Sequence, residues 1–218
     1  MFFPYKDDNP RVLVPIVTYG IIAANILIFL YQFSLAASGP ETEARFIYMF
    51  GLVPAQFHII NLFTSMFLHG GIAHILGNMW FLWIFGDNVE SALGHARYAL
   101  FYILCGLAAG LAQVLFNLDS MIPMVGASGA IAGVLGAYLI RYPHAQVHVF
   151  VFIFFFFTTI RVPAMIVLGI WFLTQLTNGL GTLGLDTTGG VAWFAHIGGF
   201  IAGVGFNYAF QHIKLKEY

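Results

Sequence analysis

The chain has 218 residues, of which 60% are hydrophobic and only 8% are charged, and its net charge is −1. A soluble domain carries about 25% charged residues, so too few charges remain here to cover a water-exposed surface. The composition therefore predicts an integral membrane protein. The lack of a basic excess argues against nucleic-acid binding, and a single cysteine, Cys105, excludes an intrachain disulfide.

Six apolar segments are candidates for spanning helices, which need about 20 predominantly apolar residues each. In chain order they are residues 14–35, 72–88, 97–117, 127–141, 163–180 and 190–211. The first ten residues lack a basic stretch before a short cleavable core, so we expect the first segment to be an uncleaved anchor. The pattern predicts an all-α membrane bundle of six helices in one domain, with a long first outer loop at 36–71.

Residues 147–160 form an apolar, Phe-rich stretch of about 14 residues, which is below the usual spanning length. The stretch is β-branched and aromatic, and Arg161 and Pro163 end it. We expect it to lie at the membrane interface or to fold against the bundle. A seventh span here would invert the last two helices and separate Ser128 from His196.

Basic residues predict the orientation, because Lys and Arg concentrate on the inner side of a membrane. With the N-terminus inside and six spans, one basic residue falls outside, Arg45. Seven fall inside: Lys6, Arg11, Arg97, Arg141, Arg161, Lys214 and Lys216. We therefore expect both termini to be cytoplasmic, in a cell membrane, with the loops before Ser128 and before His196 on the outer side.

Ser128 and His196 are the candidate nucleophile and base. The fourth segment is short, about 14 residues or about 21 Å, so its outer start lies below the membrane surface. His196 lies about six residues into the sixth segment, or about 9 Å along its axis. The two side chains are therefore expected at one depth, where histidine takes the proton that makes serine nucleophilic.

The second segment adds hydrogen-bond donors at the same depth. His74 and Asn78 are four residues apart and share a helix face. Together with the Ser128 backbone amide they suit a tetrahedral oxyanion. The nearest acidic residue before His196 is Asp186, which is in a loop, so the sequence predicts a dyad rather than a Ser-His-Asp triad. His69 is expected to be a structural hydrogen-bonder, and Glu90 to accept hydrogen bonds from a loop.

Glycines four residues apart allow membrane helices to approach closely. Gly129 and Gly133 have this spacing in the fourth segment, and Gly199 and Gly203 have it in the sixth. We expect the two glycine faces to meet and to bring Ser128 within reach of His196.

At these residues the chain resembles the rhomboid family of intramembrane serine proteases. Residues 63–78 match the family pattern His-x4-His-x3-Asn, and residues 85–90 match the end of its second helix. Residues 126–129 match Gly-x-Ser-Gly, and residues 195–203 match Ala-His-x2-Gly-x3-Gly. The four blocks occur in the family's order, and they place a catalytic core at about 60–211 of a single domain, 1–218.

The resemblance implies the roles of the site residues. It implies a Ser128 nucleophile, a His196 base and an oxyanion site of the Ser128 amide, His74 and Asn78. The supporting residues that it implies are His69, Gly126, Gly129, Gly199 and Gly203. It implies membrane-protein substrates cut in or near a spanning segment, with no metal and no cofactor.

The chain departs from the family pattern at two places. Many members carry Tyr or Phe four residues after the serine, where the ring packs on the histidine, and Ala132 stands there. Some bacterial members carry a Trp-Arg pair in the first loop, and residues 36–71 contain none.

Two other functions compete with proteolysis. A non-catalytic member of the family would bind and escort membrane helices, and Ala132 is the sequence argument for it. A channel or transporter would have a path lined with histidine, but the chain shows no repeat of two similar halves. A zinc protease is disfavoured because no His-Glu-x2-His pattern occurs.

Overall fold

The structure is a computed structural model that describes residues 2–10, 12–153, 156–182 and 190–212. The predicted inner-side residues Arg11, Lys214 and Lys216 and the loop residue Asp186 lie outside these ranges. The helices are α1 (Ile16–Ala37), α2 (Pro40–Phe50), η1 (Pro54–Gln56), α3 (Asn61–Thr64), η2 (Ser65–Phe67), α4 (Ile72–Leu93), α5 (His95–Phe116), α6 (Ser128–Arg141), α7 (Ala164–Gly181) and α8 (Trp193–His212). The strands are β1 (Phe2–Asp7), β2 (Gln146–Ile153) and β3 (Phe156–Pro163).

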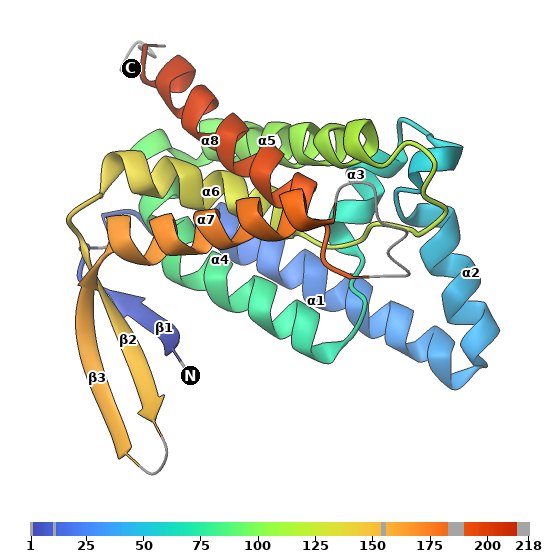
Figure 1. Ribbon diagram of the computed structural model, residues 1–218, viewed down its shortest axis with the longest axis horizontal. Coiled ribbons are helices and arrows are strands. Elements are labelled where there is room, and N and C mark those ends of the chain that lie inside the picture. The colour runs from blue at the N-terminus through green and yellow to red at the C-terminus, as the bar shows by residue number, and fades with distance from the viewer. Residues whose placement is uncertain (1, 11, 154–155, 183–189, 213–218) are drawn as a thin grey trace.

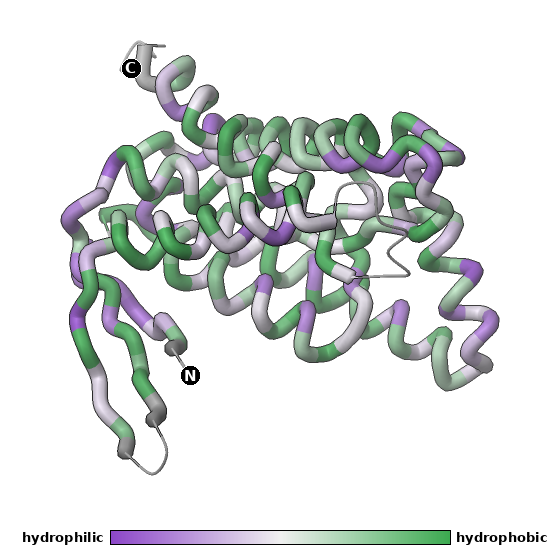
Figure 2. The backbone as a smooth tube through the Cα atoms, in the orientation of Figure 1, coloured by the Kyte–Doolittle hydropathy of each residue, from purple (hydrophilic) through white to green (hydrophobic). Residues whose placement is uncertain are grey.

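Each of the six predicted spans falls on a helix, namely α1, α4, α5, α6, α7 and α8. Three of them, α1, α5 and α7, are long and apolar enough to cross a membrane by length and composition. Hydrophobic residues run along the bundle helices (Figure 2). The chain is therefore an integral membrane protein.

Helix α1 is inverted relative to a helix of a soluble protein. Its buried residues are the polar Thr18, Asn25 and Gln32, spaced seven apart on one face. Large apolar side chains such as Leu27 and Leu30 are exposed instead. A helix that hides its polar groups and exposes its apolar ones is adapted to a hydrocarbon solvent.

Helix α4 extends to Leu93, beyond the predicted end at residue 88. The extension holds Glu90, which is fully buried. Its carboxylate accepts hydrogen bonds from the Val17 amide at 2.9 Å and from the Thr18 amide at 2.8 Å and hydroxyl at 2.6 Å. Glu90 thus binds the N-terminal amides of α1, which have no partners within their own helix. Glu90 was expected to accept hydrogen bonds from a loop. Its partners belong instead to helix α1, so this acidic residue joins α4 to α1.

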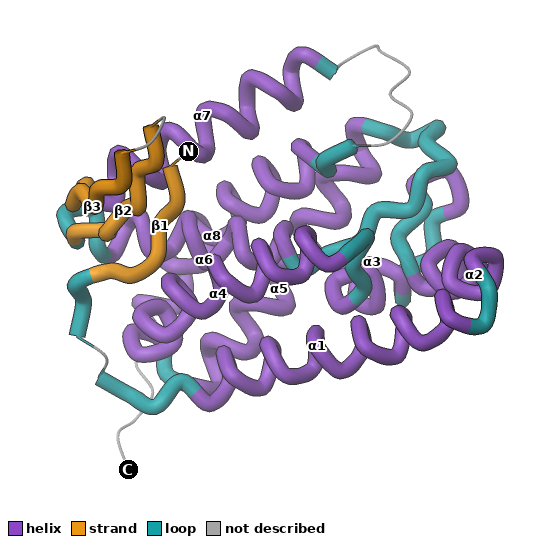
Figure 3. Tube along the Cα trace, turned by 90° about the horizontal axis from the view of Figure 1, so that it is seen from below, coloured by secondary structure: helices purple, strands orange, loops and turns teal. Residues whose placement is uncertain are grey.

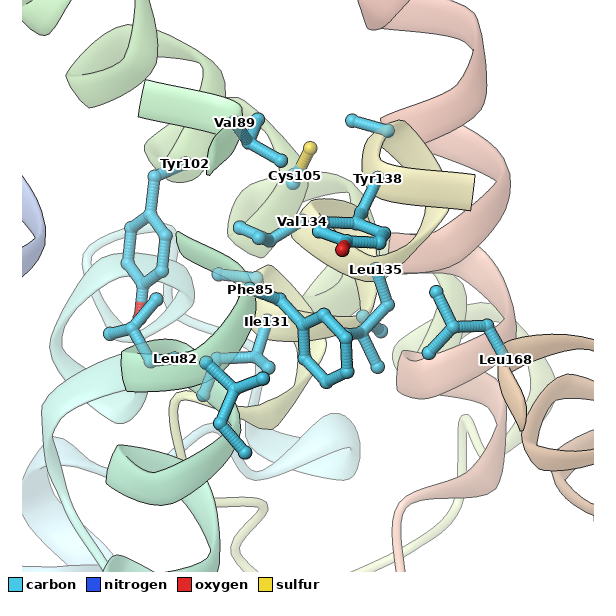
Figure 4. Close-up of a cluster of buried hydrophobic side chains, with 14 of the residues drawn as sticks. Leu82, Phe85, Val89, Tyr102, Cys105, Ile131, Val134, Leu135, Tyr138 and Leu168 are labelled. Carbon is cyan, nitrogen blue, oxygen red and sulfur yellow. The ribbon is translucent and has the colours of Figure 1, made fainter. Parts of the chain in front are cut away.

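The centre of the bundle is α6, which packs against α4, α5 and α8. Buried apolar side chains from α4, α5, α6 and α7 meet around it (Figure 4). Figure 3 shows α1 and α7 on opposite sides of the molecule, with the other long helices between them.

The structure is mostly helical, as the expected all-α class requires, but one end of the molecule adds a sheet that this class does not include. β1, β2 and β3 form an antiparallel sheet in that order. The stretch 147–160 was expected to lie at the interface or against the bundle. Its described residues, 147–153 and 156–160, belong to strands β2 and β3, which project from the helices (Figure 1). Its β-branched and aromatic residues favour strands, and the N-terminal strand supplies the backbone partners for β2. The pairing of β1 with β2 joins segments far apart in sequence, so local pattern did not reveal it, whereas β2 and β3 are consecutive strands.

The expected first outer loop is also wrong in detail, since 36–71 contains α2, η1, α3 and η2. The Asn61 amide donates to the Gly51 carbonyl at 2.8 Å, and the Gln32 amide donates to the His69 carbonyl at 2.6 Å. The first contact holds the segment together, and the second fixes it to α1, at the end opposite the sheet (Figure 1).

Candidate active site

Ser128 and His196 lie within hydrogen-bond distance. Ser128 is the first residue of α6, and His196 is the fourth residue of α8. His196 Nε2 is 2.8 Å from Ser128 Oγ. Two residues 68 apart in sequence therefore lie at the separation that proton transfer between a nucleophile and its base requires.

Glycines bring these two helices into backbone contact. A Cβ atom on Gly199 would lie 2.0 Å from the Gly129 carbonyl oxygen, and a Cβ on Gly203 would lie 2.0 Å from that of Gly133. No larger residue fits at either position without moving a helix. The four predicted glycines therefore form the contact that sets the distance between serine and histidine.

His74 and Asn78 lie beside Ser128, across from the backbone of Gly126. The Gly70 amide donates to His74 Nδ1 at 3.3 Å, so a neutral His74 ring carries its proton on Nε2. A Cβ on Gly126 would lie 2.8 Å from His74 Nε2 and 3.5 Å from the Asn78 amide nitrogen. Gly126 has φ +125°, so both conformation and space require glycine here.

The donors of this group are free to bind an anion. The Asn78 amide nitrogen is buried and has no hydrogen-bond partner. The Ser128 amide is at the start of α6, where backbone N–H groups lack partners in the helix. Together with His74 Nε2 they place donors on one side of Ser128, and an oxyanion satisfies such a set.

His69 is fully buried and lies behind His74, with the two ring centroids 5.2 Å apart. Its ring also contacts Phe29 of α1 edge-on, at 6.4 Å between centroids. It is not among the residues that line the cavity at Ser128. The structure thus brings His69 to the predicted group but keeps it away from the reacting atoms.

A cavity of about 690 Å³ opens at Ser128 and His196. Its walls come from α4, α6, α7 and the segment 190–192, and they are mostly apolar or small. The polar groups in it are His74, Asn78, Ser128 and His196. An apolar cavity with a few converging polar groups is typical of a binding or catalytic site.

Sequence reasoning missed Gln175, which is buried in α7. Its amide oxygen is 2.8 Å from His196 Nδ1, and its amide nitrogen donates to the Trp171 carbonyl at 3.1 Å. The sequence predicted a dyad because no acidic residue stands near His196 in the spans, but an amide oxygen can also accept a bond from the imidazole. A polar residue in an apolar span is a functional signal, and it could have identified Gln175.

Position 132, where many family members carry an aromatic ring, is a fully buried alanine. Aromatic rings from other positions contact His196 instead. Trp171 of α7 has its ring centroid 5.8 Å from that of His196, and Trp193 packs edge-on at 6.4 Å. The aromatic contact therefore comes from α7 and α8 instead of α6.

The helices and this site define a class of protein. It is a helical integral membrane protein with a serine and histidine pair near the starts of two packed helices, α6 and α8. Residues 56–212 match the family model for the Rhomboid domain. The chain belongs to the rhomboid family.

Several relatives share this region. Rhomboid protease GluP of Bacillus subtilis (strain 168) is 39% identical over 57% of this chain and 24% of its own length. RHOMBOID-like protein 6, mitochondrial, of Arabidopsis thaliana is 32% identical over 66% of this chain and 41% of its own. Rhomboid protein 1, mitochondrial, of Saccharomyces cerevisiae is 28% identical over 93% of this chain and 54% of its own length. The chain thus spans about half or less of these relatives.

Proposed function

We propose that the chain is a serine endopeptidase that cleaves other membrane proteins in or near their spanning segments. The observation that carries the proposal is the 2.8 Å separation of His196 Nε2 and Ser128 Oγ, next to unpartnered donors and a cavity. Its relative in Bacillus subtilis is named a protease. No metal or cofactor takes part in the proposed reaction.

The proposed reaction is acyl transfer through a dyad. His196 Nε2 takes the Ser128 proton while Oγ attacks the substrate carbonyl carbon. The Ser128 amide, His74 and Asn78 stabilise the negative oxygen that forms. His196 then gives the proton to the leaving amine, and water hydrolyses the acyl-enzyme by the reverse sequence.

The substrates proposed are membrane-spanning segments. A helix shields its own carbonyls, so a substrate must unwind near the cleaved bond, and its backbone groups then need partners. The polar groups of the cavity provide them, while its apolar wall from α4 and α7 suits the rest of the segment. We also propose six spans, with cytoplasmic termini and a site that opens to the outer side of a cell membrane.

Reaction with a fluorophosphonate probe tests the activated serine. We expect the detergent-solubilised protein to be labelled, and labelling to vanish in Ser128→Ala and His196→Ala, because one removes the nucleophile and the other its base. Ser34→Ala is a matched control, since Ser34 lies exposed on α1 and bonds only its own helix at Tyr31. A folded wild-type protein that remains unlabelled would instead favour the non-catalytic binder of membrane helices.

A further inference from the structure

His196 is held by a helix that carries none of the sequence motifs. Gln175 and Trp171 are one turn apart on α7, and both contact the His196 ring. The bond from the Gln175 amide nitrogen to the Trp171 carbonyl, at 3.1 Å, fixes which end of the amide faces His196. The oxygen end faces it, because the nitrogen end is already engaged by an acceptor.

This contact selects one tautomer of the histidine. An amide oxygen only accepts hydrogen bonds, so His196 Nδ1 must carry a proton to bond it at 2.8 Å. A neutral imidazole has one N–H, and Nε2 is then left with its lone pair directed at Ser128 Oγ, at 2.8 Å. We propose that Gln175 is a positioning residue that keeps the His196 proton on Nδ1 and so leaves Nε2 free to act as the base.

The inference rests on the proposed function and gives Gln175 a defined part in it. As the Ser128 Oγ–carbon bond forms, the carbonyl π pair moves onto oxygen and the serine proton moves to Nε2. The resulting imidazolium keeps its Nδ1–H bond to Gln175. When the C–N bond breaks, the Nε2 proton goes to the leaving nitrogen. Gln175 exchanges no proton, and it supplies the orienting role of a triad aspartate without its charge.

Trp171 restrains the same ring by packing against it, where position 132 offers only a methyl group. Helix α7 therefore supplies two contacts that orient the base, beside the edge-on contact of Trp193, although α7 lies at the edge of the bundle (Figure 3). Outward displacement of α7 would remove both restraints together. The readiness of the dyad thus depends on the packing of a peripheral helix.

The tautomer can be observed without any activity. In the full chain in detergent, ¹⁵N signals of the His196 ring, assigned by comparison with His196→Gln, distinguish protonated from unprotonated nitrogens. We expect Nδ1 protonated and Nε2 unprotonated at neutral pH, with a loss of this preference in Gln175→Leu. A protonated Nε2 in the wild type, or an unchanged tautomer in Gln175→Leu, would overturn the proposal.

Kinetics supply the second readout. Loss of the acceptor leaves a buried N–H unpaired, so Gln175→Leu is expected to lower kcat by about 10- to 100-fold with little change in KM. Gln175→Glu keeps an acceptor and adds a charge that favours imidazolium, so it should restore activity and move the acidic limb of the pH profile to higher pH. Thr174→Val, on the exposed face of α7, is the control and should match wild type.

The two proposals fail in different ways. Unchanged kcat and pH profile in Gln175→Leu would overturn the positioning role while the protease function stands. A wild-type protein with the Nδ1 tautomer that neither reacts with the probe nor cleaves a membrane substrate would overturn the protease function and leave the role of Gln175 in setting the tautomer supported.

Discussion

At the scale of single residues, Asp7 shows how burial changes chemistry outside the helices. Its carboxylate accepts hydrogen bonds from Tyr138 and, at 3.0 Å, from the Asn88 amide. Burial, with a smaller contribution from the nearby Asp87 carboxylate, raises the pKa of Asp7 to about 6. The folded protein thus favours the neutral acid, in contrast to Asp8, where a bond from His148 lowers the pKa.

The sign of the resulting pH dependence follows from linkage. The folded-state pKa of Asp7 lies above its ordinary value of 3.8, so its contribution to stability is full below about pH 4 and is lost as pH rises through about 6. We expect Asp7→Asn to gain Tm relative to wild type between about pH 4 and about pH 8, as measured by thermal unfolding in detergent.

Asp8→Asn is the control with the opposite sign. The lowered pKa of Asp8 means that its contribution is present above the ordinary value and is lost as pH falls through the folded value. The Tm of Asp8→Asn should therefore lie below that of wild type by a nearly constant amount between about pH 4 and about pH 8, and the difference should shrink only below about pH 4. Parallel curves for wild type and Asp7→Asn would show that Asp7 ionises freely in the folded protein.

The site residues illustrate what single residues reveal in the sequence. Gly126, Ser128 and His196 stand out because their types and spacing are rare in an apolar chain. Gln175 does not stand out in the sequence, because a single Gln in a spanning helix often serves only as a hydrogen-bonding contact between helices. Only the packing of α7 on α8 shows that it bonds His196.

At the scale of elements, the contact between α6 and α8 determines the geometry of the dyad. Gly199→Ala would place a methyl group 2.0 Å from the Gly129 carbonyl oxygen, so the helices must separate. We expect a loss of about 1–3 kcal/mol in unfolding free energy, as for other overpacked cores, and weaker probe labelling because Ser128 and His196 move apart.

Gly205→Ala is the matched control on the same helix. A Cβ at Gly205 would meet nothing within 4 Å, so unfolding and labelling should stay at wild-type levels. Equal behaviour of Gly199→Ala and Gly205→Ala would mean that the α6–α8 contact does not control the dyad. Denaturant unfolding in mixed micelles measures both variants under one condition.

Helices were easier to predict than strands in this chain. Long apolar segments specify helices because a bilayer admits few other backbone structures. Their ends were less certain, as at α4, where Glu90 and its neighbours are buried against α1 rather than exposed at the interface. The pairing of β1 with β2 joins residues 2–7 to residues 147–151, so no local window contains it, whereas the pairing of β2 with β3 is local.

At the scale of the whole molecule, the predicted orientation can be tested with cysteines. The native Cys105 is fully buried, so it should not react with a membrane-impermeant maleimide. Lys6 is exposed at the sheet end and Arg45 is exposed on α2, at the opposite end. We expect Arg45→Cys to react only from the outside of intact cells, and Lys6→Cys only in inverted vesicles.

The unsubstituted protein is the control for the cysteine labelling, since it should not react with the maleimide from either side of the membrane. Reaction of both cysteines from one side would contradict the proposed orientation. Reversed accessibility would place Ser128 toward the cytoplasm, because Arg45 and the start of α6 lie at the same end of the bundle.

The sequence by itself determined that the chain is a membrane protein and that six segments are helical, and it identified the serine, histidines and asparagine that we propose carry the chemistry. These properties follow from the composition, the length of the apolar segments and the spacing of neighbouring residues, all of which are local features of the sequence. Tertiary structure alone decided the pairing of β1 with β2, the burial of Glu90 against α1, and the contacts of Gln175 and Trp171 with His196. Each of these joins residues from distant segments, and their partners are fixed only when the helices pack.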